Sequence, residues 1–270
     1  MSAVSTSRQQ ATERAPWRAV AIPSEHGGWG LTLEPVLLGL VVAFSWSGLA
    51  IGLAAFVAFL VRTPLKLAVV DRRRHRTLPR TRLATRIAAV ELVVLVALGV
   101  AALWSAGTEW LVPVLIAVPL VAVELWFDIR SRSRRLVPEL AGAVGIAAVA
   151  ASITVAGDEG WRLAVALWMV LAARAVASIP YVRTQIVRTR RGSSPLVTTD
   201  LFQVAGAAFG FAAVAVDTRV LLGAIVVAAL ALGQSIAIRR GHIPPVKVIG
   251  LRQMAAGLAV VAATAVGVLA

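Results

Sequence analysis

Nine apolar runs follow one another along the 270-residue chain, and they constrain the fold more than any other feature. Each run has close to the roughly 20 residues that a helix needs to cross a hydrocarbon core of about 30 Å. Hydrophobic residues make up 59% of the chain, above the roughly 45–50% of soluble domains. The sequence therefore predicts an all-α polytopic membrane protein with nine transmembrane helices, at about 32–47, 50–70, 86–104, 110–127, 138–156, 161–181, 199–216, 219–238 and 250–269.

The basic residues are distributed unequally between the two sides of these runs. Of the 27 Lys and Arg residues, 22 fall in the N-terminal segment and in the connections after runs two, four, six and eight, whereas only Arg162 and Arg219 fall on the other side. By the positive-inside rule this predicts a cytoplasmic N-terminus, an outside C-terminus and a multi-pass protein of the inner (cytoplasmic) membrane. The net charge of +14 is then mainly a topology signal, and no nucleic-acid partner is expected.

The sequence lacks the residues or motifs that several classes of protein chemistry require. The chain has no cysteine, which excludes disulfides, thiol nucleophiles and cysteine-bound metals. Its three histidines, His26, His75 and His242, do not have metal-ligand spacing, so no metal site is predicted. No phosphate-binding glycine loop, serine-hydrolase or metalloprotease motif occurs, and no cleavable signal peptide is evident.

Ionisable residues inside the apolar runs are the main candidates for a site, because charges in a membrane usually face the bundle interior. Arg62 and Lys66 are four residues apart and share a helix face, and so do Arg174 and Tyr181, seven apart. Together with Arg183 and Arg188, after run six, they are predicted to bind an anionic group. Two other interpretations stay open: structural ion pairs with Glu34, Glu91 or Glu124, and a Lys66 that simply reaches the interface.

A second polar feature precedes the first run, in the stretch IPSEHGGWGLTLEP, Ile22 to Pro35. A functional interpretation has Glu25 and His26 form a polar group at the cytoplasmic mouth, with a histidine that titrates near neutrality. By composition alone, the favoured interpretation is an interfacial entry turn, with Gly27 and Gly28 in the turn and Trp29 as its anchor. Asp71 lies nine residues after Arg62, on the opposite face unless the helix has ended, in which case it reaches the same mouth. Asp71, Glu25 and His26 are the candidate catalytic residues.

A short internal sequence repeat predicts that the chain consists of two related halves. LVRTPLK ends run two and YVRTQIV ends run six, and each leads into an arginine-rich connection followed by a proline. Repeats of this kind often place a binding site at their interface. The predicted organisation is a cytoplasmic segment over 1–31, carrying the EHGGW motif, and one nine-helix domain over 32–270 with halves of about 32–127 and 138–270.

The segments PSEHGGW, VRTPLK and PYVRTQ resemble the YwiC-like family of bacterial membrane proteins over most of the chain. The architecture also resembles the UbiA-type intramembrane prenyltransferases, nine-helix proteins in which Mg²⁺ ions bridge acidic loops after helices two and six to an isoprenoid diphosphate. The segment WFDIRSRSRRLVPELAG, after run four, resembles a loop of those enzymes.

The chain departs from the acidic UbiA-type motifs. The spacing N-x-x-x-D-x-x-x-D falls on Arg62, Lys66 and Val70, with Asp71 one place late, and no acid occurs between Glu159 and Asp200. Mg²⁺ prefers carboxylate and phosphate oxygens, so the carboxylate motifs do not support a magnesium site and no cofactor is evident. Arginine and lysine side chains are expected to meet an anion directly instead.

These observations predict a cytoplasm-facing cationic cavity in a UbiA-like bundle that binds an anionic amphiphile, either an isoprenoid diphosphate or a phospholipid-like molecule. If the protein is an enzyme, the resemblance implies a prenyl or lipid transferase without the usual aspartate-rich magnesium sites. Two alternatives stay open, a transporter or flippase for a small anion or lipid, and a non-catalytic accessory subunit of a membrane complex. The lipid bilayer is the expected environment, and no oligomeric state follows from the sequence.

Overall fold

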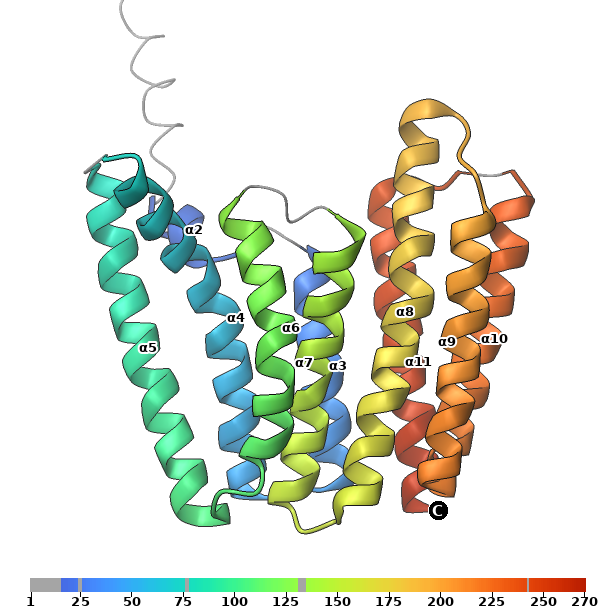
Figure 1. Ribbon diagram of the computed structural model, residues 1–270, viewed down its shortest axis with the longest axis horizontal. Helices are drawn as coiled ribbons and strands as arrows, with labels where there is room; N and C mark the ends of the chain where they lie inside the picture. Colours follow the sequence, from blue (N-terminus) through green and yellow to red (C-terminus); the bar gives the residue numbers. More distant parts are fainter. Residues whose placement is uncertain (1–15, 24–25, 76–77, 131–134, 242) are drawn as a thin grey trace, which may run out of the picture.

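The structure, a computed structural model, describes residues 16–23, 26–75, 78–130, 135–241 and 243–270. Its regular elements there are helices, arranged side by side in one bundle (Figure 1). A short helix, α2 (Pro16–Ala21), precedes the long ones. The other helices are α3 (His26–Val42), α4 (Trp46–Arg73), α5 (Pro79–Ala106), α6 (Leu111–Ile129), α7 (Leu136–Ala156), α8 (Trp161–Arg191), α9 (Val197–Val216), the 3₁₀ helix η1 (Thr218–Val220), α10 (Leu221–Arg239) and α11 (Val246–Leu269).

Eight of the described helices are long and apolar enough to cross a membrane, and a shorter apolar helix, Gly28–Val42, takes the place of the first predicted run. The polytopic α-helical membrane fold is therefore confirmed. The first helix begins and ends earlier than the predicted 32–47, because Ser45 starts the next helix by accepting a hydrogen bond from the Gly48 amide. In Figure 1, α3 begins at the upper end of the bundle and α11 ends at the lower end.

Two helices extend well beyond the predicted runs. α5 begins at Pro79 instead of about 86, because proline suits the first turn of a helix and the Thr81 hydroxyl accepts a hydrogen bond from the Leu78 amide. α8 continues to Arg191 instead of ending at 181, since Pro180 is accommodated inside it and the helix stops only at Gly192, which has a positive φ of 77°. Several arginines that the sequence placed in connections are therefore on helices.

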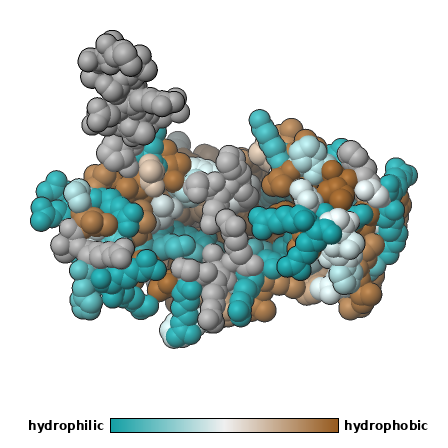
Figure 2. Space-filling view, turned by 90° about the horizontal axis from the view of Figure 1, so that it is seen from above, coloured by the Kyte–Doolittle hydropathy of each residue, from teal (hydrophilic) through white to brown (hydrophobic). Residues whose placement is uncertain are grey.

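Most described basic side chains lie at one end of the bundle, which we call the basic end: the end with the α4–α5, α6–α7, α8–α9 and α10–α11 connections. Figure 2 looks down on this end and shows hydrophilic side chains over much of it. At the other end, Arg162 and Arg219 lie beside the first turns of α8 and α10. The positive-inside rule predicts that this end faces the cytoplasm.

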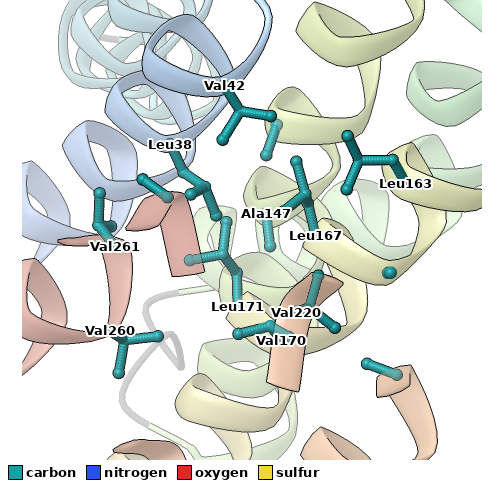
Figure 3. Close-up of a cluster of buried hydrophobic side chains, with 14 of the residues drawn as sticks. Leu38, Val42, Ala147, Leu163, Leu167, Val170, Leu171, Val220, Val260 and Val261 are labelled. Atoms are coloured by element: carbon teal, nitrogen blue, oxygen red, sulfur yellow. The ribbon is translucent and has the colours of Figure 1, made fainter. Parts of the chain in front are cut away.

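The hydrophobic core lies where α3, α7, α8 and α11 meet. In an apolar 18-residue stretch of α8, 72% is buried inside the protein, whereas only 11% of the corresponding stretch of α5 is buried. Figure 3 shows Leu38, Leu167, Leu171 and Val260 converging from these helices, and each is at most 4% exposed. α5 instead packs on α2 and α4 and presents Val93, Val96 and Trp104 outward, as expected of a helix that faces lipid.

Candidate functional site

Arg62 and Lys66 of α4 form ion pairs with two carboxylates of α6. Arg62 Nη1 lies 2.6 Å from Glu124 Oε1, and its Nε donates to Asp128 Oδ2 at 3.2 Å. Lys66 Nζ donates to Asp128 Oδ1 at 2.6 Å. The four-residue spacing on α4 matches the four-residue spacing on α6, so two cations meet two anions. We call these four residues the α4–α6 cluster.

The α4–α6 cluster lies near the basic end of the bundle and not at its centre. Asp128 is the residue before the end of α6, whereas α4 continues for several residues beyond Lys66. Asp128 is 4% exposed as a side chain, but Arg62 and Glu124 are each 21% exposed. A cavity that holds Arg62 for a guest would therefore require the guest to displace carboxylates already in contact with it.

Asp71 faces away from the α4–α6 cluster. α4 runs through Arg73, so the condition for Asp71 to reach the predicted mouth, an earlier helix end, is not met. Its carboxylate is buried against α5, where Oδ1 and Oδ2 accept from Arg80 at 3.1 and 3.2 Å and Oδ2 accepts from the Thr81 hydroxyl at 2.7 Å. These contacts join the ends of α4 and α5.

A second ion pair lies deep in the bundle. Arg174 Nη2 of α8 is 2.9 Å from Glu34 Oε1 of α3 and donates to the Gln253 carbonyl oxygen of α11 at 2.7 Å. The side chains of Arg174 and Glu34 are only 7% and 5% exposed. Gly257 of α11 makes room for the pair, because a Cβ at that position would overlap Glu34 Oε1. We call these residues the α3–α8–α11 cluster.

From the α3–α8–α11 cluster towards the basic end, α8 carries a stripe of buried polar residues. Arg174, Ser178, Tyr181 and Gln185 are spaced by four, three and four residues, which places them on one helix face, and each is at most 6% exposed. Gln185 Nε2 donates to the Tyr181 hydroxyl at 3.2 Å. Tyr181 was a sequence candidate; Ser178 and Gln185 were missed, although their spacing from Arg174 was the available signal.

Arg183 and Arg188 are on the extended end of α8 and have different partners. Arg183 Nη1 is 2.8 Å from Glu139 Oε2 of α7, and Arg188 Nη1 donates to the Ile238 carbonyl oxygen of α10 at 2.6 Å. Arg183 is nine residues from Arg174, or two and a half turns, so the two point to opposite faces of α8. α7 packs against both α4 and α8. The contacts thus distribute the predicted cations over four separate groups: Arg62 with Lys66, Arg174, Arg183 and Arg188.

The motif before the first membrane helix lies partly outside the described residues. Glu25 is outside them, and His26 is the first residue of α3 with a side chain that is also outside the described part. Trp29 packs edge-on against Phe59 of α4, with ring centroids 5.1 Å apart, and its Nε1 donates to the Pro23 carbonyl oxygen at 3.4 Å. A Cβ at Gly28 would lie 2.6 Å from the Phe59 ring. The Gly-Gly-Trp part of the motif therefore lets α3 approach α4 closely.

Carboxylates are spread through the bundle in ones and twos. Among the described residues, no three or more His, Asp or Glu side chains come close enough together to hold a metal ion. Asp128 and Glu124 come together on α6, and both contact Arg62. The carboxylates in the described part of the chain therefore do not form the kind of donor set that binds Mg²⁺ in the UbiA-type enzymes.

Two arginines that the sequence analysis did not single out line an opening at the basic end. Arg82 and Arg86 are one turn apart on α5, exposed, and together with Pro79 and Leu83 they line a cavity of about 430 Å³. Neither has an ion-pair partner among the described residues. The signal in the sequence is their four-residue spacing just before a long apolar run, although the sequence places both arginines in a connection.

Comparisons with known proteins identify the family of the chain. No curated protein matches the chain, and no solved structure does, so the resemblance to the UbiA-type prenyltransferases stays a prediction. The model of one protein family, described as YwiC-like protein, matches residues 22–156. That region contains the EHGGW motif and α3 to α7, half of the 270 residues. The chain belongs to the YwiC-like family.

Proposed function

We propose that this membrane protein binds the phosphate-bearing headgroup of an anionic amphiphile at its cytoplasmic face, on Arg82 and Arg86 of α5. The observation that carries the proposal is the cavity of about 430 Å³ that these two exposed arginines line. Arginine forms strong charge-assisted hydrogen bonds with phosphate oxygens. Arg82 and Arg86 have the geometry for one anion, because side chains four residues apart are neighbours on a helix surface.

The position of the cavity suits an amphiphile better than a soluble anion. Leu83 lies between the two arginines and packs against a small apolar cluster with Val20 of α2 and Ala68 of α4. From Val90 onward α5 presents apolar side chains outward, including Val93 and Val96 at 68% and 63% exposed. A headgroup held by Arg82 and Arg86 would thus have its chains alongside the lipid-facing surface of α5.

The proposal moves the anion site away from the cations first predicted to hold it. Arg62 and Lys66 contact Glu124 and Asp128, and Arg183 contacts Glu139, so an anion at those positions would compete with carboxylates. Asp71, one of the predicted bases, accepts hydrogen bonds from Arg80 and Thr81. The proposal is therefore one of binding and includes no prenyl transfer.

Lipid retention by the purified full-length protein tests the proposal. Native mass spectrometry would count bound dioleoyl phosphatidic acid, dioleoyl phosphatidylcholine and geranylgeranyl diphosphate in separate titrations. We expect the two ligands with a net negative charge, phosphatidic acid and geranylgeranyl diphosphate, to bind in preference to zwitterionic phosphatidylcholine, and their order identifies the natural class. Because a basic residue at a membrane surface contributes about 1 kcal/mol to binding an anionic lipid, Arg82→Gln with Arg86→Gln should weaken binding by about thirtyfold.

The matched control removes the same charge from the same end of the bundle. Arg190 and Arg191 are exposed at the end of α8, and Arg190→Gln with Arg191→Gln should change binding little. Equal losses in the two double variants would show a general charge effect and reject the site. Retained binding in the α5 variant, with loss in Arg62→Gln, would assign the anion to the α4–α6 cluster instead.

A further inference from the structure

A small cavity with a polar wall lies inside the bundle between α8, α10 and α11. Its volume is about 10 Å³, and its polar lining comes from Arg174, Ser178, Gln234 and Gln253. The rest of the lining is apolar, mainly alanine and valine side chains of the same three helices. It is separate from the opening beside Arg82 and Arg86, which lies at the end of α5.

Two buried polar atoms of the residues lining this cavity have no hydrogen-bond partner among the described residues. They are Arg174 Nε, a donor, and Gln253 Oε1, an acceptor. Arg174 is 6% exposed, and its Nη2 already contacts Glu34 and the Gln253 carbonyl oxygen. A buried donor and a buried acceptor without partners are costly, and buried polar atoms of native proteins normally have a partner. The two atoms are complementary, so one guest that both accepts and donates would satisfy them.

The size and charge of the cavity restrict the guest. A volume of about 10 Å³ holds roughly one water molecule and excludes phosphate, lipid headgroups and organic substrates. An anion is disfavoured because Glu34 already balances the charge of Arg174. A cation is disfavoured by the adjacent guanidinium. Water meets both requirements, since it can accept a hydrogen bond from the donor and donate one to the acceptor.

We infer that this cavity is a binding site for a single water molecule that accepts from Arg174 Nε and donates to Gln253 Oε1. Ser178 and Gln234 offer further hydrogen-bonding groups on the same wall. Such a water would join α8, α10 and α11 and would hydrate one side of the Arg174–Glu34 pair.

A structure of the full-length protein in lipid nanodiscs, at a resolution of about 2 Å, tests the inference directly. The expected result is a density peak within about 3 Å of both Arg174 Nε and Gln253 Oε1. A map that shows ordered waters elsewhere but no peak here would overturn the inference. So would a map in which the two atoms bond directly to each other.

The substitution Gln253→Met provides an independent test, because the Tm should change in opposite directions with and without a bound water. Methionine is close in size to glutamine but has no strong acceptor, and the backbone carbonyl that binds Arg174 is retained. If water bridges the two side chains, the variant loses the peak and its Tm falls by several degrees. If the site is dry, the substitution removes an unsatisfied oxygen from an apolar interior, and the Tm rises. A rise in Tm would therefore reject the water site.

Discussion

Two ion-pair clusters combine the same components in different surroundings. In each, an arginine of a long helix meets a glutamate that lies against a glycine of a third helix, Gly142 of α7 in the α4–α6 cluster and Gly257 in the α3–α8–α11 cluster. The Arg62 and Glu124 side chains are each 21% exposed, whereas those of Arg174 and Glu34 are 7% and 5% exposed.

The difference in exposure implies a difference in role. Near the basic end, the Arg62, Glu124 and Lys66 side chains are partly exposed, so solvent and salt should weaken their ion pairs and allow them to rearrange. Inside the bundle the Arg174–Glu34 pair is balanced by its own contacts, and loss of either partner leaves an uncompensated buried charge. The α4–α6 cluster is thus adjustable, and the α3–α8–α11 cluster is fixed.

Glu34→Leu should give the largest effect of any single change considered. It leaves Arg174 buried without its carboxylate, and breaking a buried pair in this way costs about 3–5 kcal/mol. We expect a fall in Tm of about 10 °C in detergent, followed by the fluorescence of the native tryptophans. Glu124→Leu in the α4–α6 cluster should cost less, because Arg62 is more exposed and keeps Asp128.

The control for this comparison removes both members of the buried pair. Glu34→Leu with Arg174→Met replaces two charges by apolar side chains of similar size, a change that is often close to neutral. Recovery of most of the lost Tm in this double variant would show that the uncompensated charge caused the loss. A double variant as unstable as Glu34→Leu would contradict the fixed role of the pair.

Gly257→Ala should have the next largest effect. The added Cβ would overlap the Glu34 carboxylate and lie 2.6 Å from Arg174 Nη2, and overpacking of this kind costs about 1–3 kcal/mol. Gly250, on the same helix α11, has nothing within 4 Å of an added Cβ. Gly250→Ala should therefore leave the Tm unchanged or raise it, because alanine is the better helix former. Equal Tm values for the two variants would argue against close packing at Gly257.

The fold was predictable because membrane-spanning runs are long, apolar and separated by basic residues. The boundaries were less predictable, since a local contact decides them. Ser45 starts α4 within a run that reads as continuous, and Pro180 stays inside α8 although it precedes the arginines that suggested a connection. Hydropathy does not report either contact.

The site was predicted only as a set of ionisable residues. The alternative of internal ion pairs is the one that the contacts favour, with Glu124 beside Arg62 and Glu34 beside Arg174. Asp128 was missed because the fourth run was ended at residue 127, although its spacing from Glu124 equals that of Lys66 from Arg62. Partners on separate helices cannot be assigned from spacing alone, because spacing fixes a face and not the neighbour that it meets.

Lys66→Met removes a cation from the more exposed α4–α6 cluster and should have a small effect on stability. Lys66 is 36% exposed, and Asp128 keeps its hydrogen bond from Arg62 Nε. The loss should be below about 1 kcal/mol, and a double-mutant cycle with Asp128→Asn would measure the coupling energy. Raising the salt concentration should reduce this coupling, while the Glu34–Arg174 coupling stays nearly constant. If the coupling between Lys66 and Asp128 did not change with salt, the α4–α6 cluster would be fixed like the α3–α8–α11 cluster.

The smallest expected effect is a pH dependence at the opposite end of the bundle, at Asp217 between α9 and η1. The hydrogen bond from the Arg219 side chain, 2.8 Å from Nη2 to Oδ2, holds the pKa of the Asp217 carboxyl below its ordinary value despite partial burial. A lowered pKa in the folded state means that this contact stabilises the protein fully above the unfolded pKa, about 3.9 for aspartate. That stability is lost as the pH falls through the lower folded pKa. Asp217→Asn should therefore flatten the acid side of a Tm-against-pH curve by a small amount, and an unchanged curve would show that Arg219 contributes nothing there. Because the Arg219 side chain is 44% exposed, the Asp217–Arg219 ion pair should weaken with salt, as the ion pairs of the α4–α6 cluster should. The salt dependence of an ion pair in this protein would then follow the exposure of its arginine or lysine.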